Sequence, residues 1–128
     1  MQSERRILVT GGAGYIGSHV VRQLLAENFN VTVLDNLRFG SASLLGVIGQ
    51  PGFRFVKGDI RDPEAVKNAL QGVDSVVHLA ALVGESACDN ESEEAVSVNL
   101  EGTKYMVDLA RESGVEHFIL FSTCSAYG

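Results

Sequence analysis

The sequence has little cysteine, little positive charge and no long hydrophobic run. Its two cysteines, Cys88 and Cys124, have no metal-like spacing, so we expect free thiols in a reducing cytosol. Ten basic residues against sixteen acidic ones give a formal net charge of -6, which argues against nucleic acid or an anionic membrane as a partner. Residues 1–9 do not resemble a secretion signal, and no segment approaches the length of a membrane span. We therefore expect a cytoplasmic protein.

The length of 128 residues and a hydrophobic content of 45% predict one domain with a packed core. Apolar runs that favour strands alternate with amphipathic segments that favour helices, without repeats or linkers. We predict strands at residues 7–9, 31–34, 53–56, 73–79 and 117–122. We predict helices at residues 15–27, 62–70 and 90–113, the second with Asp62 as its cap and Pro63 at its first position.

This alternation predicts an α/β fold with a doubly wound parallel sheet, the Rossmann fold, covered by helices on both faces. Right-handed crossovers give the strand order 3-2-1-4-5. Ligands of such sheets bind beyond the carboxyl ends of the strands, where the first and fourth strands separate. The sequence motifs that carry chemistry fall at these ends.

The first motif is a glycine turn at residues 10–17, between the first strand and the first helix. Gly11 and Gly14 permit a tight turn and close approach of a pyrophosphate, and Gly17 lets the helix pack against the strand. Asp35 ends the second strand, where a carboxylate can accept the hydroxyl groups of the adenosine ribose and repel a 2′-phosphate. The pattern predicts NAD rather than NADP as the ligand, although nearby Arg38 partly offsets the negative charge.

Three further motifs follow the third, fourth and fifth strands. Asp59 could accept the adenine amine while Ile60 covers the ring, although spacing alone does not decide this. Small residues after His78 would let the backbone approach the cofactor, and His78 itself is best interpreted as a hydrogen-bonded core residue. The hydroxyl groups of residues 122–125 could bind a substrate oxygen, but no neighbouring base makes them or Cys124 nucleophiles.

Together these motifs resemble the N-terminal half of an extended short-chain dehydrogenase/reductase of the NAD-dependent epimerase/dehydratase family, and are similar to the UDP-glucose 4-epimerases. Seven blocks carry the resemblance: residues 10–17, 35–37, 58–62, 78–81, 83–86, 99–103 and 121–128. It implies that the glycine turn holds the pyrophosphate, that Asp35 and Asn36 hold the ribose, and that Thr123 meets the reacting oxygen of a sugar. The implied cofactor-binding residues are Gly11, Gly14, Tyr15, Ile16, Gly17, Asp35, Asn36, Leu37, Asp59, Ile60, Leu79, Ala80, Ala81, Asn99 and Ser122.

Two features depart from the family pattern. The lysine that such epimerases carry between the fourth and fifth blocks is absent, and so is the catalytic Tyr-x-x-x-Lys pair, which lies downstream of the block that ends here at Gly128. The adjacent Lys104 and Tyr105 lack that order and spacing. The family's tyrosine acts as a general base, its pKa lowered by the lysine and the nicotinamide.

We therefore expect residues 1–128 to be an incomplete NAD-binding domain of a sugar-nucleotide epimerase or dehydratase, truncated and not catalytically competent alone. A sugar nucleotide is expected to bind only if a missing C-terminal part completes the site. One alternative is a stand-alone, non-catalytic NAD-binding or interaction module, and another is a reductase of a non-sugar carbonyl. An unpaired fifth strand and a bare face on the helix at 90–113 predict a homo-oligomer.

Overall fold

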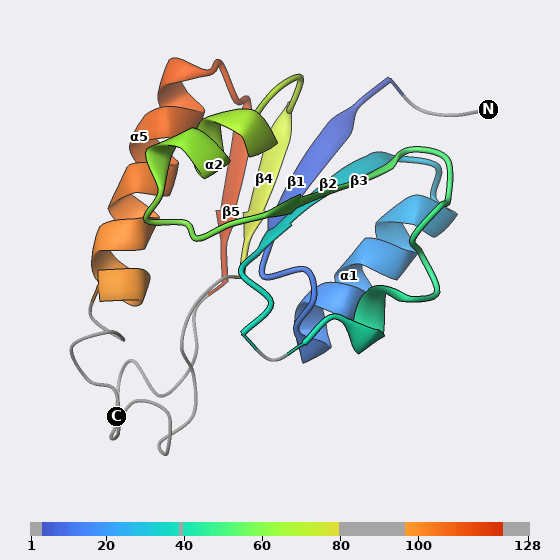
Figure 1. The fold of residues 1–128 in the computed structure, drawn as a ribbon. Helices are drawn as coiled ribbons and strands as arrows, with labels where there is room; N and C mark the ends of the chain where they lie inside the picture. The colour runs from blue at the N-terminus through green and yellow to red at the C-terminus, as the bar shows by residue number, and fades with distance from the viewer. Residues whose placement is uncertain (1–3, 39, 80–96, 122–128) are drawn as a thin grey trace.

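In the computed structural model, which describes residues 4–38, 40–79 and 97–121, five strands form one parallel sheet (Figure 1). The strands are β1 (Arg6–Thr10), β2 (Asn30–Asp35), β3 (Phe53–Lys57), β4 (Ser75–His78) and β5 (His117–Leu120). Their order is β3-β2-β1-β4-β5, and each neighbouring pair is parallel. The predicted doubly wound sheet and its strand order are confirmed.

Helices cover both faces of the sheet. Helix α1 (Tyr15–Ala26) lies on one face, and α2 (Pro63–Ala69) and α5 (Thr103–Glu112) lie on the other (Figure 1). Two buried clusters fill the layers between them. The α1 side joins Val9, Val21, Leu25, Val31, Val33, Leu44, Val47 and Val77, and the other side joins Leu8, Leu34, Val56, Ile60, Val66, Ala69, Leu70, Val73, Val76, Met106 and Ala110. Inner strands buried on both faces explain the continuous apolar runs of the sequence.

The sequence of α1 has two adjacent apolar rows, one of Ile16, Val20 and Leu24 and one of Val21 and Leu25. The second row is buried with Gly17 and Ser18, and Val20 and Leu24 of the first row are partly buried against the same core. Ile16 is 57% exposed. The first turn of α1 therefore presents its apolar side chains away from the sheet.

The short helix α2 begins as its sequence predicts. Asp62 precedes the first helical residue, Pro63, and its side chain accepts a hydrogen bond from the Glu64 backbone N–H at 3.1 Å. The cap satisfies a donor that has no partner within the helix.

Three elements differ from the predicted ones. Residues 42–44 form a 3-10 turn, η1 (Ala42–Leu44), in a segment with no predicted helix or strand. The last predicted helix contains a π-helical segment, η2 (Ser97–Gly102), before α5, and its predicted start at residue 90 lies outside the described residues. Strand β4 starts two residues later than predicted, because the Val73 N–H bonds the Leu70 carbonyl in a turn after α2.

Candidate cofactor-binding site

The glycine turn between β1 and α1 is held by backbone hydrogen bonds. Gly11 has a φ of +74°, a conformation that side chains disfavour, and its N–H donates to the Leu34 carbonyl at 2.9 Å. The Gly14 N–H donates to the Gly11 carbonyl at 3.1 Å. A Cβ atom on Gly17 would lie 2.1 Å from that same carbonyl oxygen. Glycine at position 17 is therefore a requirement of the close packing between turn and helix.

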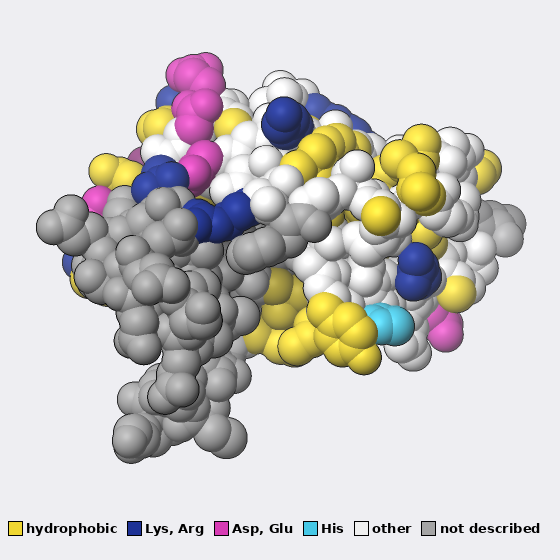
Figure 2. All heavy atoms as spheres, turned by 60° about the horizontal axis from the view of Figure 1, so that its bottom comes forward, with side chains coloured by type: hydrophobic (Ala, Val, Ile, Leu, Met, Phe, Trp, Pro, Cys, Tyr) yellow, Lys and Arg dark blue, Asp and Glu magenta, His cyan; other side chains and the backbone are white. Residues whose placement is uncertain are grey.

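Helix α1 starts directly after a glycine. Its cap residue, Gly14, makes no side-chain capping bond, and the N–H groups of the first turn of any α-helix have no partner within the helix. Tyr15 and Ile16 are both exposed. Hydrophobic side chains are also visible at the face of the molecule where the strands end (Figure 2). A helix start of this kind, with its positive dipole end, fits an anion such as a pyrophosphate.

Asp35 lies beside this turn at the end of β2. Its carboxylate accepts the Ala13 N–H at 2.9 Å and the Leu37 N–H at 2.7 Å. Leu37 has a φ of +60°, which is uncommon for a residue with a side chain and marks a locally constrained loop. The carboxylate is thus fixed next to the glycine turn, and a carboxylate has further lone pairs with which to accept hydroxyl groups.

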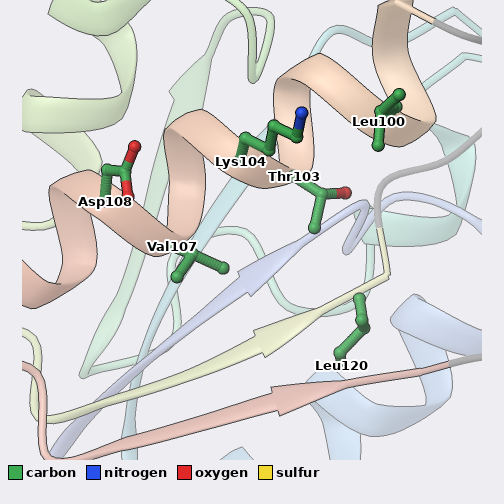
Figure 3. Close-up of a pocket in the computed structure, with 6 residues that line it drawn as sticks. All are labelled: Leu100, Thr103, Lys104, Val107, Asp108 and Leu120. Atoms are coloured by element: carbon green, nitrogen blue, oxygen red, sulfur yellow. The ribbon is translucent and has the colours of Figure 1, made fainter.

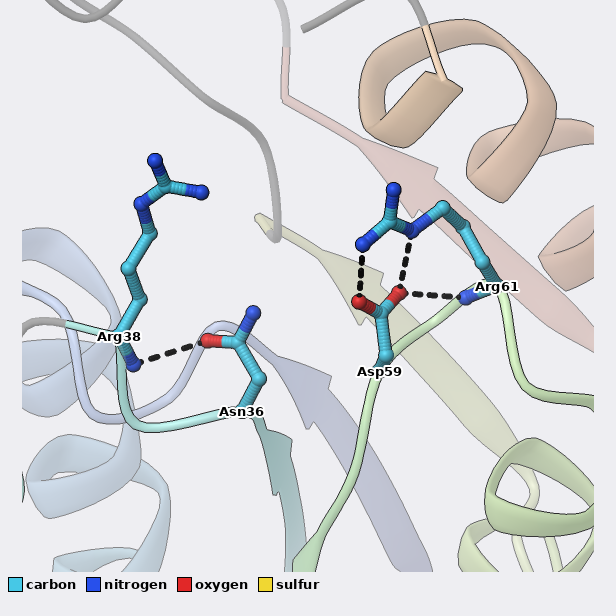
Figure 4. A network of polar contacts seen from close by, with 4 residues as sticks. All are labelled: Asn36, Arg38, Asp59 and Arg61. Carbon is cyan, nitrogen blue, oxygen red and sulfur yellow. Dashed lines mark hydrogen bonds and ion pairs between the residues drawn. The ribbon is translucent and has the colours of Figure 1, made fainter. Parts of the chain in front are cut away.

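The loops after β2 and β3 carry four polar side chains, drawn in Figure 4. Arg38 and Asn36 share a backbone-to-side-chain bond, in which the Arg38 N–H donates to Asn36 Oδ1 at 2.9 Å. Arg61 holds the Asp59 carboxylate with its backbone N–H, its Nε and its Nη2, at 2.8, 2.9 and 2.5 Å. This side-chain bond from Arg61 is the main cause of a lowered pKa of Asp59, which burial opposes. Asp59 is therefore an oriented anion.

Ile60 does not present its side chain as the sequence suggests. It is 4% exposed and belongs to the buried cluster on the α2 and α5 side of the sheet. A Cβ atom added to Gly102 would lie 2.6 Å from Ile60 Cδ1, so the side chain points toward α5. The Ile60 side chain is therefore packed in the core and is not presented to an adenine ring. The Ile60 backbone is the remaining candidate contact.

His78 is a core residue that joins three elements. It is 2% exposed, and its Nδ1 pairs with Thr10 Oγ1 at 2.7 Å while its Nε2 pairs with Thr103 Oγ1 at 3.0 Å. Burial lowers the pKa of His78 to about 4. The ring is hydrogen-bonded and neutral near pH 7, which agrees with its interpretation as a structural residue.

The backbone after β4 continues alongside β1, its parallel neighbour in the sheet. The Leu79 N–H donates to both the carbonyl oxygen and the Oγ1 of Thr10, at 3.1 and 3.0 Å. Leu79 is therefore next to Thr10, the last residue before the glycine turn. Its groove-lining role stays a prediction. Ala80, Ala81, Ser122 and Thr123 lie outside the described residues, and of Asn99 only its backbone, within η2, is described.

A hollow lies between α5 and β5. It is lined by Leu100, Thr103, Lys104, Val107, Asp108 and Leu120 (Figure 3). None of these six is among the predicted cofactor-binding residues. Leu120 faces the helix from the outermost strand, so this hollow belongs to the edge of the sheet, whereas the glycine turn follows the central strand.

Comparison with known proteins decides the family. The sequence profile described as the NAD dependent epimerase/dehydratase family matches residues 7–128. The chain belongs to this family. The resemblance stated from the seven sequence blocks is thereby confirmed.

Individual members of the epimerase/dehydratase family match nearly the whole chain. The low-salt glycan biosynthesis protein Agl12 of Haloferax volcanii is 40% identical over 95% of this chain, which spans 40% of that protein. A UDP-glucose 4-epimerase of Klebsiella pneumoniae is 38% identical over 96% of this chain, which spans 92% of that sequence. Across the matched relatives, the chain thus spans from less than half to nearly all of the partner's length.

A solved structure agrees with the fold. The dTDP-glucose 4,6-dehydratase DesIV of Streptomyces venezuelae, crystallised as a double mutant with NAD and DAU bound, has a TM-score of 0.89 and 40% identity. The match covers 96% of this chain and 41% of that one. In the part of the chain that the structure describes, no helix is both long and apolar enough to cross a membrane.

Three features of the site were not found from the sequence. These are the Arg61 contacts to Asp59, the two threonines on His78, and a bond from Ser43 to the glycine turn. Arg61 stands two residues after Asp59, so a local ion pair could have been anticipated. Ser43 is thirty residues from its partner and has no motif around it.

Proposed function

We propose that this chain binds NAD and is the cofactor-binding part of a sugar-nucleotide epimerase or dehydratase. The observation that carries the proposal is the position of Asp35, whose carboxylate is 2.9 Å from the Ala13 N–H of the glycine turn. That contact sets a ribose-hydroxyl acceptor directly beside a helix start suited to a pyrophosphate. The two groups are adjacent in a dinucleotide as well.

The residues present fit NAD. At Gly17 a side chain would collide with the turn, so glycine keeps the helix start close to β1. In the proposed complex the first turn of α1 holds the pyrophosphate, Asp35 and Asn36 hold the adenosine ribose, and Asp59 accepts the adenine amine. The Asp35 charge disfavours a 2′-phosphate, so NAD is preferred over NADP.

NAD supplies a hydride acceptor and donor in the chemistry of this family. The 128 residues contain no Tyr-x-x-x-Lys pair, so we propose that this chain binds the cofactor without turning over a sugar nucleotide by itself. Thr123 is proposed to meet the sugar oxygen when those residues are supplied. A Tyr-x-x-x-Lys pair in the coding sequence beyond codon 128 would support the enzyme assignment, whereas NAD binding with no such pair would favour a non-catalytic module.

The binding proposal is tested with Asp35→Asn, which keeps the side-chain shape and removes the charge. Hydrogen bonds to charged groups are worth about 1.5–3 kcal/mol, so we expect the Kd for NAD to rise about tenfold or more by calorimetry, and the preference over NADP to shrink. Asp74→Asn is the matched control, because Asp74 bonds the Arg6 N–H at the opposite end of β1. Equal NAD affinity in wild type and Asp35→Asn would contradict the proposal.

A further inference from the structure

The segment that contains η1 packs against α1 and contacts the glycine turn. The 3-10 turn η1 follows the loop after β2, and Leu44 and Val47, each 2% exposed, are buried in the cluster that contains Val21 and Leu25 of α1. Two buried side chains fix this segment against α1. Ser43, between them and the loop, is therefore held in place by the core.

Ser43 makes two contacts that join α1, η1 and the glycine turn. Its Oγ donates a hydrogen bond to the Ala13 carbonyl oxygen at 2.5 Å. Its own carbonyl oxygen accepts a hydrogen bond from Arg22 Nη2 at 2.9 Å. We call Ser43 and Arg22 the Ser43 latch. It connects the middle of α1 to the turn that begins the same helix.

Together with Asp35, the Ser43 latch binds both backbone polar groups of Ala13 in the turn. The Ala13 N–H is bound by Asp35 and the Ala13 carbonyl is bound by Ser43. The C=O and N–H of a trans peptide point in opposite directions. A carbonyl held toward Ser43 therefore keeps the next N–H, that of Gly14, directed away from Ser43, where it bonds the Gly11 carbonyl.

This geometry matters for an anion. If the Ala13–Gly14 peptide rotated, the Gly14 N–H would lose its bond to the Gly11 carbonyl, and the Ala13 carbonyl oxygen would face that oxygen instead. The turn would then change shape directly before the start of α1, which is the end of the helix that attracts negative groups. The hydroxyl of Ser43 opposes that rotation through its bond to the Ala13 carbonyl.

We propose that Ser43, supported by Arg22, is a positioning residue that keeps the glycine turn in the form that receives the pyrophosphate of the dinucleotide. The proposal rests on NAD binding as proposed above. Neither residue belongs to the glycine motif or to the ribose-binding block, so the latch is a third component of the site, contributed by the segment between β2 and β3.

The test compares Ser43→Ala with Ser43→Thr, which restores a hydroxyl, and with Ser41→Ala, the control at an exposed serine whose side chain makes no capping bond. Calorimetry with NAD should show a Kd about five- to tenfold higher for Ser43→Ala, within about twofold of wild type for Ser43→Thr, and unchanged for Ser41→Ala. Arg22→Met should act in the same direction more weakly.

Two readouts separate positioning from a general loss of folding. Adenosine, which has no pyrophosphate, should bind Ser43→Ala and wild type alike when titrated by NMR. Without any ligand, the amide signals of Gly14 and Tyr15 should move in Ser43→Ala and return in Ser43→Thr, while the urea midpoint stays close to wild type.

The inference is overturned if Ser43→Ala binds NAD as wild type does, or if it loses NAD and adenosine to the same degree. If wild type itself fails to bind NAD, the proposed function fails. The ligand-free amide signals then still decide about the latch, because unchanged Gly14 and Tyr15 signals in Ser43→Ala would show that Ser43 does not shape the turn.

Discussion

At the scale of single residues, the site depends on glycine where two backbone segments meet. Gly17→Ala would place a Cβ atom 2.1 Å from the Gly11 oxygen and 2.9 Å from Gly12 Cα, so the backbone of the turn must move. We expect a loss of about 1–3 kcal/mol in the free energy of unfolding, the usual cost of overpacking, together with weaker NAD binding. Urea unfolding followed by circular dichroism measures the first effect.

Gly46→Ala is the control for that substitution. A Cβ atom at position 46 has no neighbouring atom within 4 Å, so we expect a change within about 0.5 kcal/mol. If Gly17→Ala proved as stable as Gly46→Ala, the close contact between the turn and α1 would not be a real constraint.

Arg61 gives a second prediction at this scale. Arg61→Met removes two side-chain donors from Asp59 and the main cause of its lowered pKa. We expect NAD affinity to fall several-fold at pH 7 and to fall further on acidification than in wild type, because Asp59 then gains a proton at higher pH. Calorimetry at pH 5 and pH 7 measures both.

Arg54→Met is the matched control for Arg61→Met. Arg54 bonds the Asn68 side chain and carbonyl on α2, outside the site, so its loss should leave NAD affinity and its pH dependence unchanged. An Arg61→Met variant with the same affinity profile as Arg54→Met would exclude the proposed orientation of Asp59.

The site residues that could be predicted are those marked by a short sequence pattern. The glycines and Asp35 have fixed spacings after strands, so the sequence alone indicates them. The orientation of Ile60 depends on how close Gly102 comes, and the role of Ser43 depends on a contact across thirty residues. Such contacts are created by tertiary packing, which has no local pattern.

At the scale of elements, His78 links β4 to β1 through Thr10 and to α5 through Thr103. Its pKa is about 4 in the folded protein, below the value of 6.5 for a free histidine. Between about pH 4 and pH 6.5, the unfolded chain therefore binds a proton at His78 that the folded protein does not bind. Stability should fall as the pH drops from about 6.5 to about 4, by up to about 3 kcal/mol from this group, and this contribution levels off below.

The difference between wild type and His78→Gln isolates that effect, since other acidic groups titrate in both proteins. Urea unfolding between pH 4 and pH 7.5 should give a shallower dependence for His78→Gln. The control His19→Gln changes an exposed histidine of α1 and should keep the wild-type profile, because the buried ring is intact. Parallel profiles for wild type and His78→Gln would show that His78 is not buried as a neutral ring.

The elements themselves were predictable where a hydrophobic pattern or a cap marks them. All five strands and α1 follow hydrophobic patterns alone, and α2 adds a cap, since Asp62 with Pro63 marks its start. The 3-10 turn η1 has no period, and its segment is buried through Leu44 and the following Val47. The π-helical segment before α5 lies where Gly102 packs against Ile60, an interaction between distant segments.

At the scale of the whole molecule, the outer edge of the sheet is apolar. Ile119, Leu120 and Phe121 in and after β5 are each about half exposed, and within the described residues no strand pairs with the outer side of β5. Such an edge can pair with another copy. We expect a concentration-dependent dimer or larger oligomer by light scattering.

Ile119→Lys should shift that equilibrium toward the monomer, since a charged edge opposes strand pairing. Ile48→Lys changes an exposed isoleucine far along the chain from β5 and should leave the oligomer intact. A wild-type protein that stays monomeric at high concentration would count against self-association through β5.

The central claim is that the glycine turn and Asp35 together hold NAD. Calorimetric titration of the protein with NAD, and in parallel with NADP, tests it most directly. The account predicts one NAD per chain with a Kd in the micromolar range, and clearly weaker binding of NADP because of the Asp35 charge. A folded protein that binds neither dinucleotide, or that binds NADP as well as NAD, would contradict it.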